Sequence, residues 1–562
     1  MIRLLAASMI AVVAGGFASL VAGNVAIHPA VASASSSASV PRGLYVANGS
    51  SPSTITSFPL GGSGNVAPTA TVSACTSCSG KLDPGYGEAF DAAGDLWVSN
   101  YYDRPGTVIE YTPSQLSTTG TPTPAITISG LSNPTGLAFD AAGDLWVAEH
   151  GNDTLVEFTP PQLLASGSPT PAVTISATNM SITRPWALAF DAHGDLWVSN
   201  AGVNTSSQYT LVEFTPPQLS ASGSPTPAVT ISSGSLVDPE GLAFDAHGDL
   251  WASNTGNCTP NCGTLVELTP SQLSTSGSPT PAVTISSPSS SSPEGLDFPE
   301  NVAFDAAGDL WVADSTSNLL AEYTPSQLTS TGNPTPAKTI GGANTSLSSP
   351  AGLVIAEPPT VTSISPASGP GTGGTTVTVT GTGFTPKSAV FFGDVPAFSD
   401  QTTYVSPDEM TAVSPAGSGT VDVTVGTVFG TSAKTVADRF SYLGYWEVAS
   451  DGGIFSFNAP FYGSMGGQPL NKPIVGIAAD PATGGYWEVA SDGGIFSFNA
   501  PFYGSMGGQP LNKPIVGIAA DPATGGYWEV ASDGGIFSFN APFYGSMGGQ
   551  PLNKPIVGIA EG

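Results

Sequence analysis

The sequence predicts an all-β protein, and three observations lead to this prediction. The 562 residues include 69 glycines and 51 prolines, which is typical of chains with many tight turns. Short runs of Val, Leu, Phe, Trp and Thr alternate with Gly, Pro, Asn and Asp, and no amphipathic helical stretch stands out. The runs also recur in repeating groups along the chain, which indicates repeated β-sheet units.

The charge balance excludes two classes of partner. The chain has 42 acidic and 12 basic residues, and its formal net charge is −30 at pH 7. Nucleic-acid binding requires clustered Lys and Arg side chains against phosphate, and binding to anionic lipid requires the same. We therefore expect no nucleic-acid partner and no electrostatic attachment to a membrane.

The N-terminus predicts export. Arg3 precedes a long apolar run, and Ala32-Ser33-Ala34 offers an A-x-A cleavage site, so we interpret residues 1–34 as a signal peptide. The alternative is an uncleaved membrane anchor. A Ser-rich leader, residues 35–40, follows. We expect a secreted or cell-surface protein with no membrane span after cleavage.

The phrase AFDAAGDLWVSN organises the first 350 residues. It begins at Ala89, and close copies begin at Ala138, Ala189, Ala243 and Ala303. Each copy belongs to a unit of about fifty residues with four strand-like runs, and these runs are apolar on both faces. Four strands per unit at this period predict a β-propeller.

The propeller is expected to have six blades over residues 43–357. Five blades carry a Trp in the second strand, namely Trp97, Trp146, Trp197, Trp251 and Trp311. The sixth is split, because Leu44–Asn48 and Ile55–Leu60 open the chain without a first strand. Pro350–Ala356 supplies the missing strand, and this pairing would remove the exposed sheet edge.

The repeated FDAAGD is interpreted as a tight turn. Asp91 and Asp95 resemble part of a calcium loop, but the full ligand spacing of such loops is absent. Asp and Gly are the residues that a turn between two strands requires.

The loops that differ between copies indicate a binding face. The second-to-third loops run from NYYDRPGT to HGNDT and DSTSN, and the fourth-to-first loops vary as well. Both sets emerge on the same side of an antiparallel blade, and variable loops on a rigid scaffold usually carry binding. The candidate ligand-binding residues are Tyr101, Tyr102, His150, Trp186, Glu240 and Glu300. His150, beside Glu149, is also a weak candidate for a general base.

Four cysteines lie in the variable loops as two local pairs, Cys75/Cys78 and Cys258/Cys262. In an exported chain such pairs predict short-range disulfides. A four-thiolate zinc site is the alternative, but the pairs belong to blades one and five, which are not neighbours.

The repeated phrase resembles the NHL type of propeller over Gly43 to Ala356, and more loosely the regucalcin/gluconolactonase and virginiamycin B lyase propellers. Those two enzyme families hold a divalent ion at the channel mouth with Glu, Asp and Asn, and the lyases also use a His. The resemblance implies that Glu240, Glu300 and Asp314, with Asn254, could hold Ca²⁺ or Mg²⁺. The alternative is that these side chains cap strand ends.

Residues 358–443 resemble an IPT/TIG domain, an immunoglobulin-like sandwich. The resemblance rests on Ile364-Ser365-Pro366, Gly369-Pro370, Gly373-Gly374-Thr375, Val377 to Gly383 and Phe392-Gly393. In extracellular bacterial proteins such domains are usually spacers or adhesive modules, which the resemblance implies for this chain.

Residues 444–562 form a short propeller-like repeat array. Gly444–Gly484 recurs unchanged at Gly485–Gly525, and a third copy ends in PIVGIAEG. It resembles the GYW-VASDGGIF repeats of secreted bacterial surface proteins. Three units are too few for an ordinary propeller. Two chains could pair in a homodimer, the array could be open, or further copies could exist. The aromatic residues invite a glycan-binding interpretation or serve to pack the units.

The sequence therefore predicts a six-bladed β-propeller, an immunoglobulin-like sandwich and a repeat array in a secreted or cell-surface binding or adhesion protein. Its partner would be an extracellular protein or a glycan. One alternative is a divalent-metal-dependent lyase or lactonase acting at the propeller mouth. Another is a cell-wall carbohydrate-binding protein. An enzyme is the less favoured interpretation.

Overall fold

The computed structural model describes residues 40–50, 52–74, 82, 85–176, 181–201, 209–256, 263–287 and 296–561. The predicted signal peptide and the four cysteines, Cys75, Cys78, Cys258 and Cys262, lie outside these ranges, so both remain predictions. Within these ranges no helix is long and apolar enough to cross a membrane.

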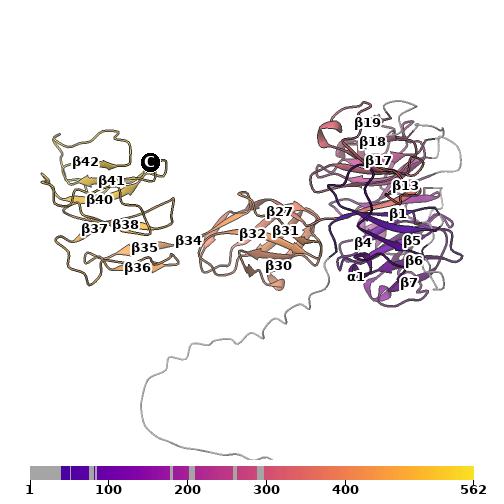
Figure 1. The fold of residues 1–562 in the computed structure, drawn as a ribbon, viewed down its shortest axis with the longest axis horizontal. Coiled ribbons are helices and arrows are strands. Elements are labelled where there is room, and N and C mark those ends of the chain that lie inside the picture. The colour runs from indigo at the N-terminus through magenta and orange to yellow at the C-terminus, as the bar shows by residue number, and fades with distance from the viewer. Residues whose placement is uncertain are drawn as a thin grey trace, which may run out of the picture. The chain divides into compact units, whose positions relative to one another are not determined.

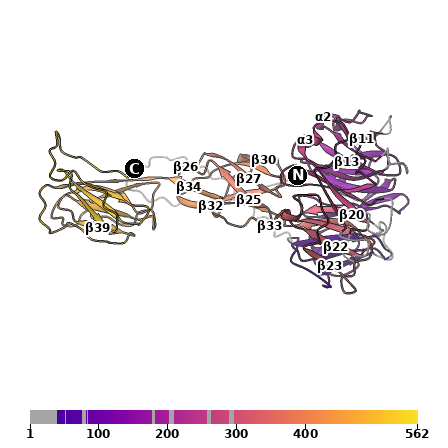
Figure 2. The ribbon, with the colours of Figure 1, turned by 90° about the horizontal axis from the view of Figure 1, so that it is seen from above.

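The all-β prediction is confirmed, and six four-stranded antiparallel sheets form the first part of the chain (Figure 1). The strands of each sheet follow one another outward, as β20, β22 and β23 show in Figure 2. The innermost strands are β24 (Pro350–Ala356), β4 (Glu88–Phe90), β8 (Pro134–Phe139), β12 (Pro185–Phe190), β16 (Pro239–Phe244) and β20 (Pro299–Phe304). The second strands are β1 (Gly43–Asn48), β5 (Leu96–Asn100), β9 (Leu145–Glu149), β13 (Leu196–Asn200), β17 (Leu250–Asn254) and β21 (Leu310–Asp314).

The two outer strands complete each blade. The third strands are β2 (Thr54–Phe58), β6 (Gly106–Tyr111), β10 (Thr154–Phe158), β14 (Thr210–Phe214), β18 (Thr264–Leu268) and β22 (Leu319–Tyr323). The outermost strands are β3 (Ala70–Ser73), β7 (Ile126–Leu131), β11 (Val173–Ser176), β15 (Val229–Ile231), β19 (Val283–Ser286) and β23 (Lys338–Gly341).

The predicted closure of the split blade is present. Strand β24 pairs antiparallel with β1, with Leu44 opposite Ile355 and Val46 opposite Leu353. The backbone N–H of Gly49 also donates to the carbonyl of Ser349 at 2.7 Å. The blade that begins the propeller is thus completed by a strand about three hundred residues later, and no inner edge is left open there.

The recurring tryptophans pack each blade against the next one. Trp97 is 2% exposed and lies in a cluster with Leu145 and Val147 of the following blade. Trp146, Trp197 and Trp251 repeat this contact around the ring. Trp311 then packs against Leu44 and Val46, so the last blade contacts the first. Between the first and second blades Tyr45 takes the place of the tryptophan and lies in a cluster with Leu96 and Val98, which completes the ring of contacts.

The constant third-to-fourth connection also joins neighbouring blades. Its TPSQL segment forms a short helix such as α1 (Pro113–Leu116), and the Gln115 side-chain oxygen accepts a hydrogen bond from the backbone N–H of Thr112. Further along the same connection, the Gly120 backbone N–H donates to Thr71 of the preceding blade at 3.0 Å. The equivalent segments of the other blades are α2 (Pro216–Leu219), α3 (Pro270–Leu273), η1 (Pro160–Leu163) and η2 (Pro325–Gln327). This interblade bridge explains why the connection varies little between copies.

The FDAAGD phrase forms the turn that the sequence predicts. One oxygen of Asp91 accepts the backbone N–H groups of Ala93 and Asp95, at 2.7 and 3.0 Å. The Asp95 carboxyl in turn lies within hydrogen-bond reach of Glu110 on the third strand. Burial, followed by the negative charges of Asp95 and Asp91, raises the pKa of Glu110 to about 8. Glu110 therefore binds a proton more readily than a carboxyl in water does.

Three further blades repeat this acid pair. The pairs are Asp144 with Glu157, Asp195 with Glu213 and Asp249 with Glu267, and burial followed by the neighbouring Asp raises the pKa of each Glu to about 7. The last blade differs, because Lys338 lies 2.6 Å from the Glu322 carboxylate and forms an ion pair with it.

The remaining strands form an immunoglobulin-like domain and a set of small sheets. One sheet of the domain holds β25 (Thr360–Ser365), β27 (Thr376–Thr382), β31 (Glu409–Val413) and β30 (Thr402–Ser406). The other holds β26 (Ser368–Pro370), β34 (Arg439–Leu443), β32 (Gly419–Thr427), β28 (Ala389–Phe392), β29 (Val395–Pro396) and β33 (Gly430–Thr431). A short 3₁₀ helix, η3 (Ser399–Gln401), precedes β30. Val377, Val379, Phe392 and Phe440 lie in the core of this domain.

The repeat array consists of three small sheets. Strands β35 (Tyr445–Val448) and β36 (Ile454–Phe457) form a two-stranded sheet. The next sheet holds β37 (Ile474–Ala479), β38 (Tyr486–Ala490) and β39 (Ile495–Phe498). The last holds β40 (Ile515–Ala520), β41 (Tyr527–Ala531) and β42 (Ile536–Phe539).

The four acid pairs predict a stability that falls as pH rises through neutrality. Folding raises the pKa of these glutamates from about 4.5 to about 7 or 8, so the folded state binds more protons between these values. Their contribution is fully present below about pH 4.5 and is lost as pH passes 7 to 8. We expect a higher melting temperature at pH 5.5 than at pH 8.5, measured by scanning calorimetry.

The matched variant replaces Glu110, Glu157, Glu213 and Glu267 together by Gln. The amide keeps a donor toward each Asp but does not titrate, so the dependence of the melting temperature on pH should flatten. An unchanged pH profile in this variant would show that the acid pairs do not control it.

Candidate functional site

The innermost strands surround a central cavity of about 300 Å³, lined among others by Tyr86, Trp186, Glu240 and Glu300. The prolines that open these strands pair with the last residue of the second strand, as Pro239 does with Asn254 and Pro299 with Asp314. The residue after each proline therefore lies at the end of the cavity where the variable loops emerge. In five blades these residues are Thr135, Trp186, Glu240, Glu300 and Ala351. In the blade of β4, Gly85 replaces the proline and Tyr86 holds the equivalent position.

Glu240 and Glu300 come from neighbouring blades and face the same cavity. Their residues are 5% and 8% exposed, and one carboxylate oxygen of each, Oε2, has no hydrogen-bond partner among the described residues. Burial raises the pKa of Glu300 to about 8, although Ser315 lowers it in part. Burial and then the charge of Glu300 raise the pKa of Glu240. Two buried carboxyls with unpaired oxygens are suited to receive a cation.

Glu88 adds a third carboxyl that the sequence interpretation missed. It occupies the position that Leu137, Leu188, Leu242, Val302 and Leu353 hold in the other blades. Glu88 is 6% exposed, and burial raises its pKa to about 8, against a smaller lowering by the Ala47 backbone N–H. A comparison of GYGEAF with PTGLAF in the sequence would have revealed this carboxyl among aliphatic residues.

Aromatic rings gather at the mouth of the cavity. The Tyr86 ring lies 5.0 Å from Trp186 and 5.3 Å from Tyr101, centroid to centroid. Tyr101 lies 4.8 Å from Tyr102 and 5.5 Å from His150, and His150 lies 5.4 Å from Trp186. The structure thus brings together Tyr101, Tyr102, His150 and Trp186, four of the predicted residues from three blades. Tyr86, which the sequence interpretation did not single out, contacts Tyr101, Tyr102 and Trp186 in this aromatic cluster.

Tyr86 links the rings to the carboxyls. Its hydroxyl lies 3.3 Å from the hydroxyl of Tyr102. Burial, then the hydrogen bond to Tyr102 and the negative charges of Glu300 and Glu240, raise its pKa well above the usual value. The phenol therefore stays protonated and can donate a hydrogen bond at the cavity mouth.

His150 is neutral in this setting. Burial, followed by the positive charge of Arg184, lowers its pKa to about 4. Its Nδ1 atom lies 3.4 Å from the Tyr101 hydroxyl. The neighbouring Glu149 carboxylate does not orient His150, because it accepts hydrogen bonds from the Ser132 backbone and the Thr154 hydroxyl, at 2.9 and 2.8 Å. A base with so low a pKa is weak at neutral pH.

Asp314 and Asn254 hold loops rather than facing the cavity with free oxygens. Asp314 accepts the backbone N–H groups of Asp297 at 2.6 Å, Phe298 at 3.1 Å and Ser317 at 2.9 Å. The Asn254 amide accepts from the Val237 backbone and donates to the Ser235 carbonyl. Of the predicted cation ligands, Glu240 and Glu300 alone keep an unpaired oxygen in the described structure.

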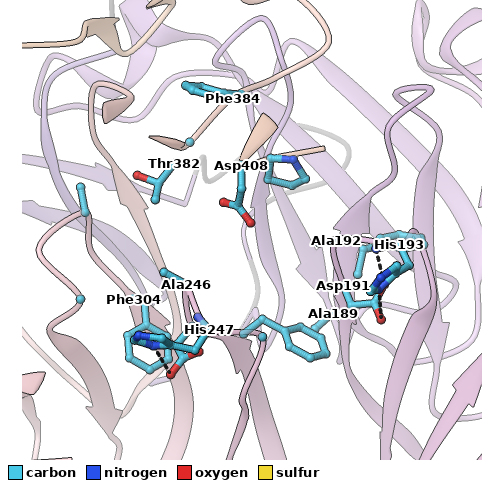
Figure 3. A pocket seen from close by; sticks show the side chains of 18 of the residues that line it. Ala189, Asp191, Ala192, His193, Ala246, His247, Phe304, Thr382, Phe384 and Asp408 are labelled. Atoms are coloured by element: carbon cyan, nitrogen blue, oxygen red, sulfur yellow. Dashed lines mark hydrogen bonds and ion pairs between the residues drawn. The ribbon is translucent and has the colours of Figure 1, made fainter. Parts of the chain in front are cut away.

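The constant turns contain two groups with metal-ligating side chains, Asp191–His193–Asp195 and Asp245–His247–Asp249. His193 lies beside Asp191 in its turn, with 3.7 Å between Nδ1 and a carboxylate oxygen, and His247 projects from the equivalent turn (Figure 3). Both histidine side chains are 85% exposed. Asp191 already accepts the backbone N–H groups of His193 and Asp195. These groups therefore act as turns.

Comparisons with known proteins identify one domain. The IPT/TIG domain family matches residues 359–442, so this part of the chain is an IPT/TIG domain. No curated protein matches the chain.

Several solved structures resemble the chain at low identity. Virginiamycin B lyase from Staphylococcus aureus is 14% identical, covers 51% of this chain and 83% of its own, and aligns with a TM-score of 0.31. A protein of unknown function from Bacteroides caccae is 11% identical, covers 56% of this chain and 98% of its own, with a TM-score of 0.37. A catalytically inactive variant of the lyase with quinupristin is 13% identical, covers 62% and 92%, with a TM-score of 0.30.

Replacing Glu88 by Leu should stabilise the protein. The leucine would match the aliphatic residues at this level of the cavity and remove a buried carboxyl, which typically costs about 1–3 kcal/mol. Because burial raises the pKa of Glu88 from its ordinary value of 4.5 to about 8, the gain in unfolding free energy should increase as pH rises from about 4.5 to about 8 and then level off.

The measurement is the melting temperature of Glu88→Leu and the parent chain at pH 6 and pH 9. Asp394→Leu, at an exposed carboxylate, is the control for added hydrophobicity. A melting temperature of Glu88→Leu below that of the parent chain would show that the buried Glu88 carboxyl stabilises the fold and would contradict this prediction.

Proposed function

We propose that this protein is a secreted or cell-surface binding protein whose propeller receives a positively charged group at the mouth of its central cavity. The observation that supports this most directly is the pair of unpaired, buried carboxylate oxygens of Glu240 and Glu300. They lie in the same cavity as the Tyr86 and Trp186 side chains.

The chemistry of the site favours an ammonium group. A cation between Glu240 and Glu300 would stabilise their ionised form and so oppose the effect of burial on their pKa values. Electron-rich faces of Tyr and Trp attract the same charge. The cavity of about 300 Å³ admits a side chain or one sugar ring rather than a whole macromolecule. A lysine side chain of a protein or an amino sugar of a glycan would meet these requirements, and the net charge of −30 attracts either.

The other two parts suit display and attachment of the propeller. The IPT/TIG domain would act as a spacer, and the repeat array would attach the protein to a surface or to another chain. We favour packing over sugar binding for the repeated aromatics, because Tyr486, Trp487 and Tyr527 are 0% exposed.

A metal-dependent lyase or lactonase is the second candidate. Glu240 and Glu300 provide hard oxygen donors of the kind that Ca²⁺ or Mg²⁺ prefers. A bound ion would polarise a carbonyl oxygen of the substrate, and the neutral imidazole of His150 would stand at the mouth of the cavity.

The test is to titrate the full chain with tetramethylammonium chloride and, separately, with CaCl₂ and MgCl₂, following intrinsic fluorescence and heat. The organic cation should change the fluorescence of the aromatic cluster, and Glu300→Gln or Glu240→Gln should weaken binding at least tenfold, about 1.4 kcal/mol. Binding should strengthen as pH rises toward 8, because it requires ionised carboxylates.

Glu409→Gln in the IPT/TIG domain is the matched control and should leave both responses unchanged. A response to Ca²⁺ or Mg²⁺ alone, abolished by chelator and by Glu240→Gln, would favour the enzyme and justify a substrate screen. No response to any of the three cations would exclude the proposed site.

A further inference from the structure

The three units of the repeat array have the same sequence through most of their length, yet their ends differ from their interior. Figure 1 shows β35 and β36 on one side of the stack and β42 on the other. Because the sequences are identical, every contact made between units one and two can be compared with the same contact between units two and three. The positions where such a contact is missing identify the uncovered surfaces of the first and third units.

The interface between units is the same at both occurrences. The Tyr486 hydroxyl accepts the backbone N–H of Tyr462 at 3.1 Å and donates to the Gly463 carbonyl at 2.6 Å. One unit later, Tyr527 accepts from Tyr503 at 3.2 Å and donates to Gly504 at 2.6 Å. Each tyrosine thus holds a turn of the preceding unit by two hydrogen bonds.

Aromatic and glycine contacts complete the interface. Trp446 lies 5.1 Å from Tyr486, and Trp487 lies 5.0 Å from Tyr527. A Cβ atom added to Gly504 would lie 2.8 Å from the Phe539 ring, so only glycine permits this approach, and Gly463 meets Phe498 at the same distance.

The first unit of the array exposes the tyrosine and the strand edge that the later units use to contact the unit before them. Tyr445, the counterpart of Tyr486 and Tyr527, is 58% exposed, whereas both counterparts are 0% exposed. Strand β35 also lacks an inner strand, while β38 and β41 pair with β37 and β40. This open edge lies inside the chain, directly after the IPT/TIG domain.

The other end exposes the complementary surface. Tyr544 is 85% exposed, against 40% and 39% for its counterparts Tyr462 and Tyr503. A Cβ atom on Gly545 would meet nothing within 4 Å. Residues 556–560 repeat the sequence of β37 and β40 but belong to no sheet of the described structure. Val557 in this segment is 86% exposed.

We propose that residues 556–560 of one chain pair antiparallel with β35 of a second copy of this chain, and the reverse, so that two arrays close into one ring of six sheets. The register follows from the interior pairs, in which Gly476 lies opposite Val489 and Ile477 opposite Glu488. Gly558 is therefore placed opposite Val448 of the second copy, and Ile559 opposite Glu447. The Tyr445 hydroxyl of each copy then accepts a hydrogen bond from the backbone N–H of Tyr544 in the other copy.

Closure by two copies follows from blade number and symmetry. Propellers typically have four to eight blades, and the three units of two copies together supply six. Oligomers of one chain are usually closed, with every equivalent surface used once. The N-terminal propeller of this chain already closes a ring of six sheets with a strand remote in sequence, β24 on β1. This inference is independent of the ligand proposed for the central cavity.

The experiment measures the mass of the full chain by light scattering and sedimentation at micromolar concentration. The expected mass is twice that of the chain, and it should not increase further with concentration. Ile556→Asp should give a monomer, because Ile474 and Ile515 at the same position are 4% and 0% exposed. Tyr445→Ala should do the same from the other surface.

The control is Val436→Asp, which places the same charge at a side chain that is 78% exposed in the IPT/TIG domain. It should remain a dimer. Mixing the Ile556→Asp and Tyr445→Ala chains should restore a pair, because one intact strand and one intact edge then meet. Ile556 and Tyr445 are not buried in one chain, so circular dichroism of both variants should match the parent.

A monomeric parent chain would overturn the proposal. So would oligomers that grow with concentration, because they would show an open assembly rather than a closed pair. A dimer that survives both Ile556→Asp and Tyr445→Ala would place the interface elsewhere.

Discussion

The packing of the second strand's large aromatic side chain, a tryptophan in five blades and Tyr45 in the first, against the next blade is the contact on which the propeller depends. Trp97, Trp146, Trp197, Trp251 and Trp311 lie between neighbouring sheets, and Trp311 packs against Leu44 and Val46 of the first blade, which β24 completes. Apolar burial on both faces of every sheet leaves the loops outside the core. The loops at one end can therefore change from blade to blade without altering the ring.

The central cavity contains buried carboxyls that lower the stability of the fold. Five blades have an aliphatic residue at the position that Glu88 holds in the remaining blade. The carboxyls of Glu240 and Glu300 lie at the mouth of the same cavity. Buried carboxyls without partners destabilise a fold unless a ligand compensates for them. Their concentration at one end of the cavity, beside the rings of Tyr86 and Trp186, is the strongest local indication of function in the propeller.

The repeated acid pairs and the repeat array show two further consequences of duplication. A pair such as Asp195 and Glu213 recurs wherever the turn phrase recurs, so one local interaction with a raised pKa is multiplied around the ring. In the array, identical units make identical interfaces, and Tyr445 of the first unit and Tyr544 of the third are more exposed than their counterparts.

The sequence by itself determined the all-β class, the six blades, the split blade and the turn function of FDAAGD, because strand periodicity, turn residues and repeat length are local properties. It also marked Tyr101, Tyr102, His150, Trp186, Glu240 and Glu300 as candidate ligand-binding residues. Only the tertiary structure decided which of the predicted site residues share a cavity. Asp314 and Asn254 lie in the same blades as the two glutamates, yet backbone N–H groups occupy their oxygens. Glu88 and Tyr86 join the site because the closed ring brings blades distant in sequence to one axis. The sequence shows that Glu88 replaces an aliphatic residue of the other blades, but it does not show which side chains of other blades lie beside it.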